Sequence, residues 1–210
     1  MKTTTFIFCL LLLLVSCGKD NKSGPRQGNS FQPFSADLEI QHYDYTANTV
    51  HVTSSTRVFD ISAPSISLVR ASRNIIGVIS QGDGTRVQFF NAAGKQIMNM
   101  AIGNSTAEIF LEDDLAAITL NDSQGDTVLH SFNASGTTLV SNLHARIMRV
   151  QVSGKLLTAT FVSDRSHALA IRSNGEVLVA TNQVYQSPQF IIGPYTLVFR
   201  HRGGMQEFTR

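Results

Sequence analysis

Three glycine-containing turns recur along this chain at nearly constant spacing. They are Asn91-Ala92-Ala93-Gly94, Asn133-Ala134-Ser135-Gly136 and Ser173-Asn174-Gly175, with 42 and then 39 residues between successive glycines. Each turn follows a short run rich in Val, Ile, Thr and Phe, and Asn and Gly tolerate the positive φ that tight hairpins require. Each turn therefore predicts a β-hairpin, and the spacing predicts a repeated unit of about 40 residues.

Each unit contains four strand candidates in the same order. The first strands are predicted at 67–70, 108–111, 146–150 and 189–192, and the second at 74–80, 114–120, 155–161 and 195–199. The third are predicted at 87–90, 127–132 and 166–171, and the fourth at 96–100, 138–140 and 176–180. The 107–120 segment has some helical spacing of its own, but its alignment with the other copies indicates two strands around Asp113-Asp114. A four-stranded unit of this length resembles a blade of a β-propeller.

Counting the copies gives the expected architecture. Three complete units fit at 67–104, 105–145 and 146–186, and a fourth begins at Ser187 and is one strand short at Arg210. Further strand candidates lie at 38–43, 49–53 and 57–61, and we expect them to complete the last blade, because closing the ring buries exposed strand edges. The expected fold is thus all-β, a small propeller of four blades. Five blades are one alternative, and a β-sandwich, which also has short strands at this spacing, is another.

The first 17 residues have the pattern of an export signal. Met1-Lys2 and three threonines precede an apolar run of ten residues, Phe6 to Val15, which is too short to span a bilayer as a helix. Leu14-Val15-Ser16-Cys17 follows at once and resembles the lipobox of bacterial lipoproteins. The resemblance implies that residues 1–16 are removed and that Cys17 carries a diacylglyceryl group, usually with a further acyl chain on its new amino terminus.

The anchor defines the predicted domain organisation. Acyl chains on Cys17 would hold the protein at a membrane without a transmembrane segment. Residues 17–30 are polar and predict a flexible tether, and residues 31–210 form the predicted repeat domain. Gly18 follows the cysteine where Asp would signal inner-membrane retention in the enterobacterial system, so the resemblance implies the outer membrane in a Gram-negative host. Cys9 lies in the removed segment, so no disulfide is expected in the mature domain.

The net charge of +2 belongs to the N-terminal end. Four of the 17 basic residues lie within the first 26 positions, and from Phe31 onward 13 basic residues face 14 acidic ones. A nucleic-acid-binding face requires clustered Lys and Arg in the folded part, and the domain has no such excess. We therefore expect no nucleic-acid partner.

No motif in the sequence defines a catalytic, metal or cofactor site. It has no phosphate-binding glycine loop, no His-Glu-x-x-His, no Gly-x-Ser-x-Gly and no cysteine nucleophile in the mature chain. Six histidines are scattered singly, at positions 42, 51, 130, 144, 167 and 201, and the 121–126 segment is interpreted as a polar turn rather than a Ca²⁺ loop. We therefore expect no catalytic residue, bound metal or cofactor.

Arginines provide the candidate binding residues. They fall near the first and second predicted strands of different copies, at Arg70, Arg146, Arg149 and Arg200, with Arg73 and Arg202 nearby. Inner strands of a propeller line its channel, so these guanidinium groups are candidates for binding an anion or an acidic partner, while solvated strand ends are the simpler interpretation.

Two functional hypotheses follow. The first is a lipid-anchored, non-catalytic binding or scaffold module of the cell envelope that holds a protein or glycan partner. The second is an envelope hydrolase or lyase of propeller type acting on glycan or ester substrates, because catalytic sites of that kind assemble from distant positions.

Overall fold

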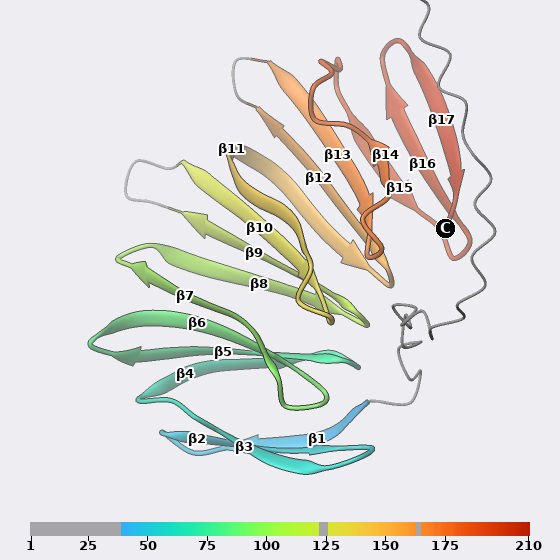
Figure 1. Cartoon of the computed structure of the whole chain (residues 1–210). Helices are drawn as coiled ribbons and strands as arrows, with labels where there is room; N and C mark the ends of the chain where they lie inside the picture. Colours follow the sequence, from blue (N-terminus) through green and yellow to red (C-terminus); the bar gives the residue numbers. More distant parts are fainter. Residues whose placement is uncertain (1–38, 122–125, 163–164) are drawn as a thin grey trace, which may run out of the picture. The chain divides into compact units, whose positions relative to one another are not determined.

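The computed structural model describes residues 39–121, 126–162 and 165–210, and the segment Ala36–Arg210 is one compact unit. Within the described ranges the chain forms 17 strands, all paired antiparallel, and no helix. None of these ranges therefore offers a helix able to cross a membrane. The strands follow one another as meanders and fall into five groups, called sheets A to E below (Figure 1).

The sheets follow the chain in order. Sheet A contains β1 (Ile40–Tyr45), β2 (Thr49–Ser54) and β3 (Val58–Ser62), and sheet B contains β4 (Ile66–Ala71), β5 (Ile75–Gly82), β6 (Gly84–Asn91) and β7 (Gln96–Gly103). Sheet C contains β8 (Thr106–Glu112), β9 (Leu115–Asn121), β10 (Thr127–Asn133) and the first half of β11 (Thr138–Ser153). Sheet D contains the second half of β11 with β12 (Leu156–Val162), β13 (Ser166–Arg172) and β14 (Val177–Val179), and sheet E contains β15 (Gln189–Ile192), β16 (Thr196–His201) and β17 (Gly204–Thr209).

The all-β, propeller-like fold class is confirmed. Sheets B, C and D are the three complete four-stranded units, and the segment around Asp113-Asp114 forms two strands, β8 and β9, as its alignment indicates. Gly94, Gly136 and Gly175 have φ of 73°, 89° and 92°, so the three hairpin turns use the positive φ for which glycine suits them. The strand β11 passes from sheet C into sheet D without interruption, which joins their backbones into one seven-stranded sheet (Figure 1).

The expected completion of the last blade by N-terminal strands is wrong for the described residues. Strands β1, β2 and β3 pair only with one another, and β15, β16 and β17 do the same. Five sheets result, which is the count of the five-blade alternative. The physical reason is local: the apolar side chains of β2 and β3 are buried against sheet B, which follows at once in the chain.

One backbone hydrogen bond recurs in all five sheets and shows that they are copies of one unit. In each, the amide N–H just after the third strand donates to the carbonyl of the residue just before the second strand. The pairs are Ala63 to Asn48, Ala92 to Asn74, Ala134 to Asp114, Ser173 to Lys155 and Arg210 to Tyr195, at 2.8–3.0 Å. From Asn74 to Tyr195 these acceptors are 40 or 41 residues apart, so the sequence period is a structural period.

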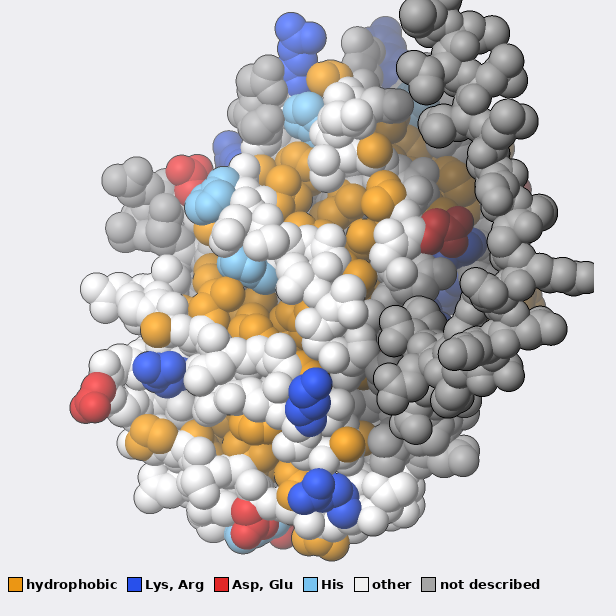
Figure 2. All heavy atoms as spheres, in the orientation of Figure 1, with side chains coloured by type: hydrophobic (Ala, Val, Ile, Leu, Met, Phe, Trp, Pro, Cys, Tyr) orange, Lys and Arg blue, Asp and Glu red, His pale blue; other side chains and the backbone are white. Residues whose placement is uncertain are grey.

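Apolar side chains on alternate positions of the second strands pack successive sheets together. Ile75 and Ile79 of sheet B face Ala116 and Ile118 of sheet C, and the same pattern joins sheet C to D and sheet D to E. Because alternate residues of a strand point to opposite faces, the second strands of sheets B, C and D are buried on both sides and are mostly apolar over their first five residues. Figure 2 shows apolar side chains in bands between the layers on one face, with Lys and Arg side chains dispersed among them.

Sheet A differs from the other sheets in which of its two faces it turns toward the neighbouring sheet. Val50 and Val52, at the second and fourth positions of β2, pack against Ile76 and Val78, at the same positions of β5. In the contacts between the other sheets, odd-numbered positions of one second strand meet even-numbered positions of the next second strand. The outward face of sheet A is therefore its polar one, as expected of a terminal repeat that caps a stack of repeats.

Candidate functional site

A β-bulge in β11 brings two of the predicted arginines onto one face of sheet D. Arg146 pairs with Val162 and Arg149 pairs with Thr160, and the register shifts at Met148 between them. Residues three apart normally lie on opposite faces of a strand, but the extra residue restores them to the same face. Met148 itself is 62% exposed. Equivalent bulges occur in the first strands of sheets A and B, so this one belongs to the repeat.

A cleft of about 320 Å³ lies between this face of sheet D and strand β15 of sheet E. Its polar lining consists of Arg149, Gln151, Thr158, Thr160 and Gln189. The register places Arg149 opposite Thr160 and Gln151 opposite Thr158, so four of these side chains form two cross-strand pairs on one face. Pro188, Phe190 and Ile191 supply the apolar part of the opposite wall. We call this the D–E cleft.

The D–E cleft interrupts a contact that is apolar elsewhere in the protein. Thr158 is the third residue of β12, and the third residues of β5 and β9 are Gly77 and Ala117, both within apolar contacts between sheets. The side chain of Thr158 is nevertheless buried, with 2% of its surface exposed. Thr158 thus marks where the cleft lies, and inspection of the sequence missed it because threonine is also an ordinary strand residue.

The structure places the four predicted arginines on three sheets. Arg146 and Arg149 share one face of β11, whereas Arg70 lies on β4 and Arg200 lies on β16 opposite Gln189. All four side chains are exposed, and within the described part of the chain none makes an ion pair. Other cations behave differently, since Arg73 pairs with Glu39 and Arg172 with Glu176. Only Arg149 of the four lines the D–E cleft, and a ring of all four stays a prediction.

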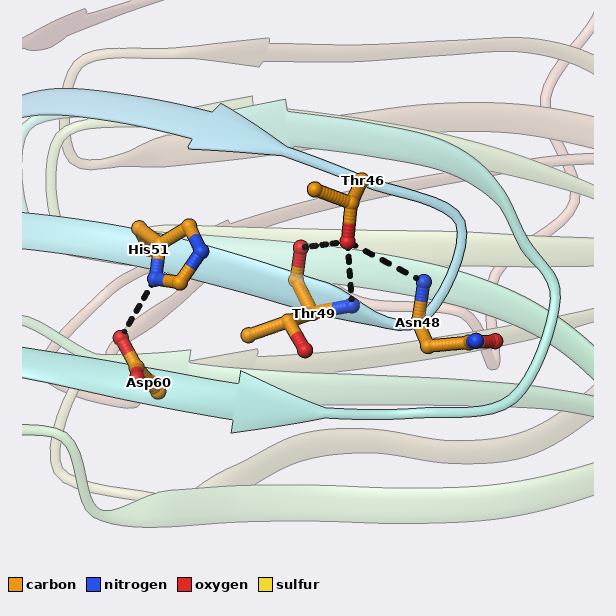
Figure 3. Close-up of polar contacts among 5 residues, drawn as sticks. All are labelled: Thr46, Asn48, Thr49, His51 and Asp60. Atoms are coloured by element: carbon orange, nitrogen blue, oxygen red, sulfur yellow. Dashed lines mark hydrogen bonds and ion pairs between the residues drawn. The ribbon is translucent and has the colours of Figure 1, made fainter.

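His51 forms the second polar arrangement, on the outward face of sheet A. Its Nδ1 lies 2.8 Å from Oδ1 of Asp60, directly across the β2–β3 pairing (Figure 3). At the β1–β2 turn nearby, the Thr46 hydroxyl donates to the Thr49 carbonyl and accepts from the amides of Asn48 and Thr49 (Figure 3). The hydrogen bond to Asp60 raises the pKa of His51 above its ordinary value. The pair is solvent-exposed and adds a side-chain contact between β2 and β3.

Of the other histidines, His130 and His144 are close enough for their charges to interact. His130 is half-buried on β10, and burial first and the charge of His144 second lower the pKa of His130. The ring of His167 stacks on Phe161, and the His201 ring contacts Tyr185 and Phe199. Among the residues that the structure describes, no three His, Cys, Asp or Glu side chains are close enough to hold a metal ion.

The two histidines with shifted pKa values should give the stability opposite pH dependences. The folded protein favours neutral His130, so below the ordinary His pKa of 6.5 the unfolded chain binds a proton first and stability falls as the pH falls. The folded protein favours protonated His51, so its contribution is complete below pH 6.5 and disappears as the pH rises through its raised pKa. Thermal unfolding at about pH 5 and 7.5 measures the stability that each protein loses between the two pH values. Compared with the wild type, this loss on acidification should be smaller in His130→Gln and larger in His51→Gln. Equal losses in both variants would contradict this assignment.

Two interpretations from the sequence fall outside the described residues. The signal pattern with Cys17 and the polar segment that follows precede residue 39, and most of the 121–126 turn lies in the gap at 122–125. The anchor therefore stays a prediction.

The fold is that of a propeller-like protein, and comparisons with known proteins support the fold and nothing more specific. No family model and no curated protein matches the sequence. A solved structure of the eukaryotic initiation factor is similar, with a TM-score of 0.51, 9% identity and coverage of 80% of this chain. The match covers 47% of that protein, so this chain spans about half its length. Other similar structures are the computationally designed Ika4 protein, with a TM-score of 0.37, 14% identity and coverage of 69% of this chain and 90% of the other, and a putative TolB from Agrobacterium tumefaciens, with a TM-score of 0.34, 10% identity and coverage of 75% and 64%.

Proposed function

We propose that this protein is a lipid-anchored, non-catalytic binding module of the cell envelope and that it binds its partner at the D–E cleft. The export pattern and the lipobox-like Leu14-Val15-Ser16-Cys17 support the anchor. The propeller-like body supports the binding role, because repeated sheets hold surface loops and clefts in a fixed arrangement.

The D–E cleft is the observation that carries the proposal. Hydrogen-bonding residues of β11 and β12 line it on one side, and Gln189 with an apolar stretch of residues 188–191 lines it on the other. Recognition sites commonly combine an apolar surface with a few placed polar groups. Arg149 has its five N–H donors without an ion-pair partner among the described residues, so they are available to a ligand. The partner would be an envelope protein or a glycan, and no nucleic acid is expected.

The anchor is tested by replacing the cysteine. Cys17→Ser removes the thiol that accepts the lipid, so the variant should lose its membrane attachment or remain unprocessed. Fractionation of host cells, with metabolic labelling by a fatty acid, should show label in the wild-type protein and none in Cys17→Ser. Cys9→Ser is the matched control and should keep the label. Labelling of Cys17→Ser, or none in the wild type, would contradict the anchor.

The binding role is tested at the cleft itself. A photo-crosslinking amino acid in place of Gln151 should capture a partner in intact envelopes, whereas the same amino acid in place of Gln88, on β6 of sheet B, should not. Equal capture at both positions, or none at position 151, would refute binding at the D–E cleft.

A further inference from the structure

We infer that the D–E cleft recognises an oxyanion, a carboxylate or a phosphate, carried by a hydroxyl-rich molecule such as an acidic sugar. This inference rests on the proposed binding function and names the chemical class of its ligand. It goes beyond the dispersed arginines of the sequence, because it assigns one guanidinium group and a defined set of hydrogen-bonding neighbours.

The charge at the cleft is positive and uncompensated. None of the described residues that line it is acidic. Arg146 lies on the same face of β11 as Arg149 because of the bulge at Met148, so two guanidinium groups of one strand face the same side. Elsewhere in the protein, by contrast, Arg73, Arg172 and Lys155 lie beside carboxylates. A concave surface with unpaired positive charge attracts anions.

The type of cation selects the type of anion. A guanidinium group presents its N–H donors in a planar fork that fits two oxygens of a carboxylate or phosphate, and lysine cannot reproduce this geometry. Arg149 pairs with Thr160 on the neighbouring strand, and both residues line the cleft. An oxyanion bound by Arg149 would therefore receive donors from two neighbouring strands.

The remaining polar groups suit a body rich in hydroxyls. Gln151 offers an amide that donates and accepts, and Thr160 offers a hydroxyl that does both. They lie on β11 and β12 of sheet D. Pro188 and the half-exposed Ile191 contribute an apolar surface against which the C–H face of a sugar ring can pack. The cleft of about 320 Å³ has the size of a site for a small ligand.

Three sugars that share one body test the inference. Glucuronate carries a carboxylate, glucose 6-phosphate carries a phosphate, and glucose carries no charge. Titrations of the purified full chain, followed by calorimetry, should show binding of one or both anions and binding at least tenfold weaker for glucose. If only one anion binds, the carboxylate or the phosphate is identified as the recognised group.

Variants at matched positions locate the site. Arg149→Gln should weaken binding of the preferred anion by roughly tenfold or more, because a charge-assisted pair is lost. Arg149→Lys, which keeps the charge and removes the fork, should give a smaller loss. Arg70→Gln is the control: Arg70 is also an exposed arginine on the first strand of a repeat, and it lies outside the cleft. Its binding should match that of the wild type, and circular dichroism verifies that each variant is folded.

Several results would overturn the inference. Binding of glucose as tight as that of the anions, an unchanged affinity in Arg149→Gln, an equal loss in Arg70→Gln, or no binding of any of the three sugars would each do so. If the inference fails in one of these ways, the proposed binding function is still tested separately, because crosslinking at position 151 reports a partner whether or not the partner is charged. Loss of that crosslink refutes both.

Discussion

Phe89→Ala is expected to lower the free energy of unfolding by about 3–5 kcal/mol, the usual cost of removing a buried aromatic ring. Phe89 lies on β6, is fully buried, and its ring meets that of Phe132 in sheet C at a centroid distance of 4.7 Å with an edge-to-face angle of 71°. The ring also covers Gly77, where an added Cβ would lie 2.7 Å from it. Its loss would leave a cavity between two sheets that cannot close, because the backbones on both sides are held by hydrogen-bonded strands.

Urea denaturation measures this effect as a shift in the transition midpoint. Tyr195→Ala is the control, because Tyr195 is also aromatic but is 80% exposed, and its loss should change the stability by about 0.5 kcal/mol or less. A Phe89→Ala protein as stable as Tyr195→Ala would show that sheets B and C do not pack through this ring.

Asn133→Ala is expected to cost about 2–3 kcal/mol, because one side chain satisfies four partners. Its Oδ1 accepts from the amides of Ser135 and Thr137 at 3.1 and 3.0 Å and from the Ser135 hydroxyl at 2.5 Å. Its Nδ2 donates to the carbonyl of Ser173 at 2.8 Å, 40 residues further along the chain. The alanine variant would lose the side-chain hydrogen bonds that stabilise the hairpin turn of sheet C. It would also lose the hydrogen bond that links this turn to the turn of sheet D.

Asn174→Ala provides a control in the turn of the next repeat, where Arg172 stands at the position equivalent to Asn133. The Oδ1 of Asn174 accepts from the amide of Glu176 within its own turn, and within the described residues the side chain makes no bond to another sheet. We expect a loss of about 1 kcal/mol or less. Thermal unfolding of both variants compares them directly. Equal losses would mean that the link between turns adds nothing to stability. Asn91, whose Nδ2 donates to the carbonyl of Ala134, should behave like Asn133.

Strand positions could be predicted from the sequence because their causes are local. The segments 74–80, 114–120 and 155–161 are second strands, which are buried on both faces, so apolar residues occupy adjacent positions in them. The turns at Gly94 and Gly136 could be predicted because an L residue is strained at positive φ. The period of about 40 residues follows from these two features and defined the all-β repeat class.

The D–E cleft could not be predicted because it depends on register. Arg146 and Arg149 share a face only because Met148 is an extra residue in its strand, and no residue type marks a bulge of this kind. Thr158 is equally inconspicuous, since its burial is visible only when sheet E is in place. The arginine candidates stay a prediction as binding residues, and the sequence could not show which of them borders a cleft.

The sequence alone thus determined the class of fold, the repeat length and, as a prediction, the anchor at Cys17, because periodicity, turn residues and a short signal pattern act within a few residues of one another. The arrangement of the sheets was decided by tertiary contacts. Val50 and Val52 could have faced either way, and the sheet they belong to packs on sheet B because Ile76 and Val78 offer the nearest apolar face. Burial of apolar area is non-directional, so a pattern of apolar residues specifies that a face must be covered without specifying by what. Tertiary structure also decided which arginine borders the D–E cleft, because that depends on the register of β11 and on the position of sheet E.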